Sequence, residues 1–192
     1  MTSKIAICNT ALIALGDAPI AAFPPTETTT RAKQCANIYD DVRDSTLRAH
    51  PWSCARKRVI LSPDVAAPAF EFSYQFTLPA DCLRVLSITE NAYIQTDYRI
   101  ESGKLLCNES AVYLTYIWRN DEPTSYDTLL VSALSAAIGA RLAYAIPGSA
   151  SLMQMFDAMF NRAINDAKGV NGAEYPFPDM PESSMVSVRA IG

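Results

Sequence analysis

The sequence predicts an α+β protein: a four-helix bundle with a small antiparallel β-domain inserted between helices two and three, followed by an extended C-terminal tail. Two patterns in the 192 residues predict this organisation. Residues 70–78 alternate large apolar and polar side chains, which is the period of a strand with one buried face. Two segments before this strand and two after it carry apolar residues three or four positions apart, which is the spacing of a helix. The predicted parts are residues 1–51 for helices one and two, 52–120 for the inserted β-domain, 121–169 for helices three and four, and 170–192 for an extended C-terminal arm.

Capping signals and prolines set the limits of the first two helices. We expect helix one over residues 3–15, with Ser3 as its N-cap and Gly16 as its C-terminal glycine. Helix two is expected to begin at residues 28–30 and to reach His50, because Pro51 cannot continue it. The face opposite its apolar stripe is charged, and we expect this face to be solvated or to contact another subunit. Its charged residues are Lys33, Asp40, Asp41, Arg43, Asp44 and Arg48.

The middle of the chain is expected to form a β-domain of four to six short strands. Pro79 ends the strand over residues 70–78, because proline has no N–H for the ladder. Residues 101–104 are typical of a hairpin turn, and residues 111–119 are rich in the β-branched and aromatic side chains of a last strand. The other expected strands are residues 56–61, 83–88, 93–100 and 105–107.

Helix three is expected from residues 127–128 to residue 146. The run over residues 129–146 is apolar enough to suggest a membrane span, but it contains Arg141, and a charge within a span costs about 2.5–3.5 kcal/mol. We therefore expect no membrane span and a helix buried in the bundle instead. Helix four is expected over residues 149–168 and is expected to end at Gly169, before the proline-rich arm.

The net charge of the chain and the pattern of its cysteines limit the classes of protein to which it could belong. A net charge of −4 does not favour a protein that binds nucleic acid through electrostatic contacts with its phosphates. The basic cluster at residues 56–58 is too short to outweigh an acidic whole. The five cysteines are scattered singly and are odd in number, so we expect no disulfide framework and synthesis in a reducing cytosol.

Catalytic patterns are weak, and we expect no enzymatic activity, no metal and no cofactor. The single histidine, His50, stands near Cys54, but the proline turn between them disfavours a nucleophile–base pair. We expect His50 to be a cation near the C-terminus of helix two. A glycosidase would need two converging carboxylates. The acidic residues available for that role are Glu90, Glu101, Glu109, Asp121 and Glu122.

The absence of a catalytic pattern favours an assembly protein, and the order of elements together with several stretches resembles a known family. The chain resembles the tail tubular protein A family, the head-to-tail adaptors of short-tailed bacteriophages. The stretches that carry the resemblance are residues 9–16 (NTALIALG), 38–44 (IYDDVRD), 50–55 (HPWSCA) with Arg58, and 78–85 (LPADCLRV).

The resemblance implies a structural protein of the virion tail that is assembled in the host cytoplasm. Members of the family form a ring, commonly a dodecamer, between the portal protein and a tail nozzle of the tail tubular protein B type. Such a ring prolongs the DNA channel and helps to retain the packaged genome, and DNA passes through it without specific binding. The ring requires a heterologous interface, in which two different patches of the subunit meet.

Two sets of residues are hypothesised to make these contacts. The first set, proposed for the subunit interface, is Asp40, Asp41, Arg43, Asp44 and Arg48, with the β-domain as the opposing patch. The second set, proposed to anchor the arm in the portal, is Tyr175, Phe177, Pro178 and Met180. Two alternatives stay open: a tail-associated peptidoglycan hydrolase, since some proteins of this family are reported as cell-wall hydrolases, and an isolated cytosolic binding module.

Overall fold

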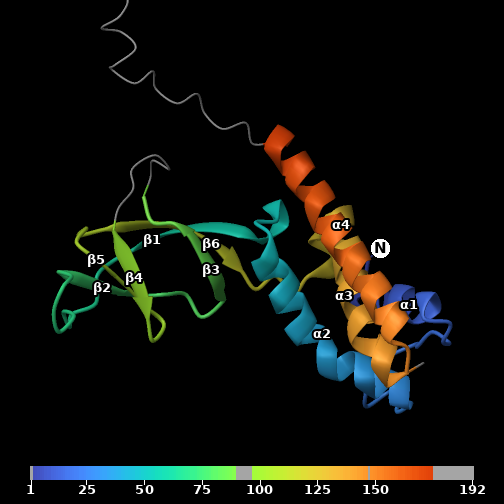
Figure 1. Cartoon of the computed structure of the whole chain (residues 1–192). Helices are drawn as coiled ribbons and strands as arrows, with labels where there is room; N and C mark the ends of the chain where they lie inside the picture. The colour runs from blue at the N-terminus through green and yellow to red at the C-terminus, as the bar shows by residue number, and fades with distance from the viewer. Residues whose placement is uncertain (1, 90–96, 147, 175–192) are drawn as a thin grey trace, which may run out of the picture.

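The computed structural model describes residues 2–89, 97–146 and 148–174 (Figure 1). Over these residues the chain is an α+β protein with four α-helices and two three-stranded antiparallel sheets. The helices are α1 (Lys4–Ala14), α2 (Thr30–Ala49), α3 (Thr128–Ala145) and α4 (Ala150–Glu174), with short 3-10 helices η1 (Ser53–Ala55) and η2 (Pro123–Ser125). The strands are β1 (Arg56–Leu61), β2 (Tyr74–Thr77), β3 (Cys82–Ser87), β4 (Tyr98–Glu101), β5 (Lys104–Cys107) and β6 (Val112–Trp118).

Helix α3 is the central element of the helical part, because it packs against α1, α2 and α4 (Figure 1). Its buried side chains include Leu130, Leu134, Ile138 and Leu142, which recur every four residues along one face. A helix this apolar is stable in water only when other elements cover it. The run with the composition of a membrane span is therefore half buried by its own fold.

The predicted helix starts are confirmed by their caps. The Ser3 hydroxyl accepts a hydrogen bond from the Ala6 N–H at 3.1 Å, and the Asp127 carboxylate accepts one from the Leu129 N–H at 2.7 Å. Gly16 follows α1 with a φ of +79°, the left-handed conformation that glycine adopts readily.

The predicted end of helix four is wrong. Helix α4 passes through Gly169 and continues to Glu174, so residues 170–174 are helical and do not belong to an extended arm. One glycine in an exposed helix interior costs about 1 kcal/mol relative to alanine, which neighbouring turns can offset. The rest of the predicted arm, with Tyr175, Phe177, Pro178 and Met180, lies outside the described residues.

The strands form two sheets, with the orders β1-β6-β3 and β2-β5-β4. The predicted hairpin turn is present between β4 and β5, where Glu101 pairs with Lys104. Its two central residues, Ser102 and Gly103, have φ values of +48° and +76°. Positive φ at both positions matches the turn whose twist suits a two-residue hairpin.

The predicted strand over residues 70–78 is only partly correct, because β2 is confined to Tyr74–Thr77. Glu71 has a φ of +71°, which breaks the extended chain before the strand begins. The alternation therefore does not run along one continuous face. Phe72 and Phe76 are buried, whereas Phe70 is 80% exposed.

Two hydrophobic cores meet at β6. Leu114 and Tyr116 of this strand pack with Phe76 in a core inside the β-domain. Ile117 points the other way and joins the helical core, which includes Tyr39 of α2. The alternation of side chains along a strand therefore places one strand in both cores.

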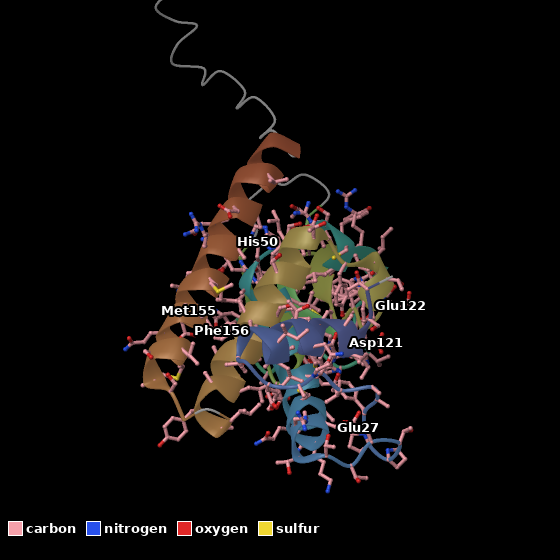
Figure 2. The ribbon with its side chains drawn as sticks, turned by 90° about the vertical axis from the view of Figure 1, so that its right-hand side faces the viewer. Glu27, His50, Asp121, Glu122, Met155 and Phe156 are labelled. Carbon is pink, nitrogen blue, oxygen red and sulfur yellow. The ribbon has the colours of Figure 1, made fainter. Side chains whose placement is uncertain are left out.

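Gly139 of α3 allows α4 to approach closely, and this contact can be tested. A Cβ at position 139 would lie 2.5 Å from ring atoms of Phe156, a fully buried side chain on α4 (Figure 2). Gly139→Ala is therefore expected to lower the free energy of unfolding by about 1–2 kcal/mol, because overpacking outweighs the gain in helix propensity. Urea denaturation measures the change.

The matched control is Gly169→Ala in α4, where a Cβ would meet nothing within 4 Å. This change is expected to raise the free energy of unfolding by roughly 0.5–1 kcal/mol. Equal stability of the wild type and Gly139→Ala would contradict the proposed tight contact between α3 and α4.

Candidate assembly surfaces

The C-terminal half of α2 is joined to the β-domain by an ion pair that belongs to a small charged network. Arg43 lies 2.8 Å from Asp40 (Nη1 to Oδ1) and 2.9 Å from Asp44 (Nε to Oδ1). The other carboxylate oxygen of Asp44 accepts a hydrogen bond from Nε of Arg119, just after β6, at 2.7 Å. Burial would lower the pKa of Arg43, but the hydrogen bond and charge of Asp44, together with the charge of Asp40, act in the other direction, and the pKa is raised. Asp44 therefore connects two cations from different parts of the chain.

The prediction that the whole charged face of α2 is exposed is wrong for Arg43. Its side chain is only 5% exposed, and it is held by carboxylates of its own helix. Asp44 is half-buried between Arg43 and Arg119. Asp40 and Asp41 are exposed, as predicted. The hypothesised interface set thus divides into residues that build the fold and residues that face solvent.

Two further arginines join the end of α2 to β3. The side chain of Arg48 donates to the carbonyl oxygen of Leu83. In return, Nη1 of Arg84 donates to the carbonyl oxygen of Arg48 at 3.1 Å. Both arginines are exposed. Their partners are backbone carbonyls, which satisfy donors without cancelling the positive charge.

The turn at residues 79–81 fixes the start of β3 through Asp81. Its carboxylate lies 2.8 Å from Nζ of Lys57 and accepts a hydrogen bond from the Tyr116 hydroxyl at 3.1 Å. Lys57 also lies over the ring of Trp118, with Nζ 3.7 Å from the ring centroid. Burial would raise the pKa of Asp81, but its bonds to Lys57 and Tyr116 outweigh this and lower it. This group stabilises the corner between the sheet and the turn.

Asn120 is an important residue that the sequence analysis did not single out. It is almost fully buried and lies between β6 and α3. Its amide nitrogen donates to the carbonyl oxygen of Cys54 at 2.9 Å and to the Ser125 hydroxyl at 2.8 Å. Its backbone carbonyl accepts a hydrogen bond from the Tyr126 hydroxyl at 2.7 Å. Asparagine before a proline-containing linker is too common a pattern to have revealed this role.

His50 caps the C-terminus of α2, where the sequence predicted it, but its surroundings disfavour the predicted cation. It is 3% exposed, and its ring meets Trp52 edge-on with centroids 4.7 Å apart. Burial lowers its pKa, and the positive charges of Lys168, Arg56 and Arg84 lower it further. Burial also raises the pKa of the Cys54 thiol, which opposes formation of a nucleophilic thiolate.

The carboxylates considered for glycoside hydrolysis are spread along the β-domain. Glu109 precedes β6 and Asp121 follows it, so the strand separates them by about 20 Å at 3.3 Å per residue. A two-carboxylate mechanism needs a separation of about 5–9.5 Å. Asp121 and Glu122 are both exposed (Figure 2), and Glu101 lies on another strand, β4. Glu90 lies outside the described residues.

A surface hollow beside α1 is lined by Thr2, Ala6, Ile7, Thr10 and Val131, none of which is an acid, a base or a strong nucleophile. Among residues 2–89, 97–146 and 148–174, no three His, Cys, Asp or Glu side chains form a group that could hold a metal ion.

No family model matches this chain, and no curated protein matches its sequence.

The lowered pKa of His50 predicts a pH dependence of stability. The unfolded chain binds the proton of this histidine more tightly than the folded chain does. Its contribution to stability is therefore complete above the ordinary pKa of 6.5 and decreases as the pH falls below that value. Urea denaturation between pH 7.5 and 5 should show the decrease.

His50→Gln should remove most of the pH dependence between pH 6.5 and 5, because His50 is the single histidine in the chain. An NMR titration of the imidazole Cε1–H measures the pKa directly. A folded-state value at or above 6.5 would contradict the role assigned to burial and to the neighbouring cations.

Proposed function

We propose that this chain is a head-to-tail adaptor of a short-tailed bacteriophage, a structural protein of the virion tail that assembles in the host cytoplasm. In this proposal copies of the chain form a ring between the portal protein and the tail nozzle. A dodecamer is the stoichiometry that the resemblance implies. The ring extends the DNA channel and helps to retain the genome. The origin of the proposal is the sequence resemblance over residues 9–16, 38–44, 50–55 with Arg58, and 78–85.

The supporting observation is the two-part shape of the subunit. In Figure 1 the β-domain lies to one side of the helices, so the molecule presents two different ends. A ring needs such a heterologous pair of surfaces, because one patch must dock on a different patch of the next subunit. The corresponding architecture that we propose is a four-helix bundle with the β-domain inserted between α2 and α3.

The polar contacts between the two parts favour a subunit that keeps its shape on assembly. Asp44 of α2 binds Arg119 after β6, and Arg84 of β3 binds the backbone of Arg48. We propose that the exposed members of the charged face, Asp40, Asp41 and Arg48, contact the β-domain of the neighbouring subunit. Arg43 and Asp44 support this face from within the subunit.

Electron microscopy tests the adaptor proposal. Purified protein is mixed with the portal ring encoded near it in the same genome. We expect an added ring of density at the tail-facing end of the portal, and the image gives its symmetry. A bare portal beside monomeric protein, across a range of salt and protein concentrations, would contradict the proposal. In that case, clearing of peptidoglycan would be the next assay.

The C-terminal arm supplies a separate prediction. We propose that Tyr175, Phe177, Pro178 and Met180 anchor in the portal. Truncation after Glu174 should leave the unfolding transition unchanged and lower portal binding at least tenfold in a pull-down titration. Replacement of Tyr175, Phe177 and Met180 together by serine is the matched full-length control. Normal portal binding by both variants would contradict the role of the arm.

A further inference from the structure

Two arginines flank β6 on the side that faces the helices. Arg56 of β1 and Arg84 of β3 are both paired with Ile117 of β6. Directly paired residues of neighbouring strands point to the same face of a sheet. Ile117 belongs to the helical core, so both arginines rise from the face toward the helices. With strands about 4.8 Å apart, the two side chains begin about 10 Å from each other.

The ends of α2 and α4 bring two more cations to this place. Nη1 of Arg84 donates a hydrogen bond to the carbonyl oxygen of Arg48 at 3.1 Å. Arg48 is the penultimate residue of α2. The charges of Lys168 on α4, Arg56 and Arg84 all act on the His50 ring, which lies just after α2 (Figure 2). Cations from α4, β1 and β3 therefore lie near His50, and the hydrogen bond from Arg84 brings the end of α2 to the same place.

The same sheet face continues away from the helices. Arg58, two residues after Arg56, is paired with Thr115, and Ile60 is paired with Tyr113. Arg58 is exposed, and Ile60 and Tyr113 are 66% and 41% exposed. We call this surface the basic face. Its cations are Arg48, Arg56, Arg58, Arg84 and Lys168.

The strands of this sheet contribute no carboxylate to the basic face. None of the described strands β1, β3 and β6 contains an aspartate or a glutamate. Asp44, one turn before Arg48 on α2, is already bound by Arg43 and Arg119. In a chain of net charge −4, the basic face is therefore a local concentration of positive charge.

We propose that the basic face binds the phosphate backbone of duplex DNA. Arg58, Arg84, Arg48 and Lys168 are exposed cations, and the planar fork of arginine matches the geometry of phosphate oxygens. Their spread over two strands and two helix ends suits a linear polyanion rather than a single small anion. Phosphate contacts carry no sequence information, so the binding is independent of DNA sequence.

Charge density favours nucleic acid over an acidic surface of a second copy of this chain. The sequence contains only two pairs of adjacent acidic residues, Asp40-Asp41 and Asp121-Glu122. Each pair offers two charges, whereas duplex DNA carries one charge per about 1.7 Å of helix axis. The inference needs neither the ring nor the portal, so it stands or fails independently of the proposed adaptor function.

Fluorescence anisotropy with a labelled 20-base-pair duplex tests the proposal on the full chain. With about four cations in contact, the logarithm of the affinity should fall against the logarithm of salt concentration with a slope of about −3 to −4. Arg58→Gln and Lys168→Gln should each weaken binding and reduce the slope by about 1. Arg58 is paired with Thr115 through the backbone, but among the described residues its exposed side chain makes no ion pair, so its replacement should leave the unfolding transition unchanged.

Arg99→Gln on β4 is the matched control, because it removes the same charge from the other sheet. The Arg99 side chain is 57% exposed and lies 3.6 Å from Glu71, so the variant should bind DNA within about twofold of the wild type. If Arg99→Gln and Arg58→Gln weakened DNA binding equally, the net charge of the chain would explain the loss, and the proposal would be overturned. Absence of binding at 50 mM salt would overturn it as well. Equal or tighter binding of a ten-residue polyglutamate would assign the face to an acidic protein instead.

Discussion

Strand β6 is the element on which the rest of the structure depends. It is paired on both edges, with β1 and with β3, and its two faces belong to different cores. A shift of its register by one residue would move Leu114 and Tyr116 out of the β-domain core and Ile117 out of the helical core. The burial of both faces therefore fixes the register. The same register aligns Arg56 and Arg84 on either side of Ile117.

The polar contacts at the junction follow from this hydrophobic arrangement. A buried arginine is costly unless carboxylates pair with it, and Arg43 has Asp40 and Asp44 as partners. Asp44 extends the contact to Arg119, and Asn120 joins the end of β6 to the segment that leads into α3. These bonds are directional, whereas apolar packing is not. They set the orientation of the β-domain relative to the helices, and hence the place where the basic face forms.

The charge distribution gives the proposed functions a common physical basis. An adaptor that prolongs a DNA channel must let DNA pass, and a net charge of −4 does not favour strong attraction of the whole chain to phosphates. The basic face would provide a limited, salt-sensitive contact on this acidic chain. In that proposal the contact does not read the DNA sequence, because it engages only the backbone. The exposed acidic residues of α2, Asp40 and Asp41, lie before the basic end of the same helix and remain available to a protein partner.

The sequence by itself determined the order of elements, the starts of α1, α2 and α3, and the hairpin turn at Ser102 and Gly103. These features depend on caps, periodicity and turn conformation, all of which are local. Only the tertiary structure decided that Arg43 is buried, that Glu71 interrupts the alternation before β2, and that α4 continues past Gly169. It also decided that Arg56 and Arg84 flank Ile117 and that Arg84 binds the backbone of Arg48. Residues so far apart in sequence become neighbours through strand register and helix packing. Neither the register nor the packing can be predicted from a local sequence pattern.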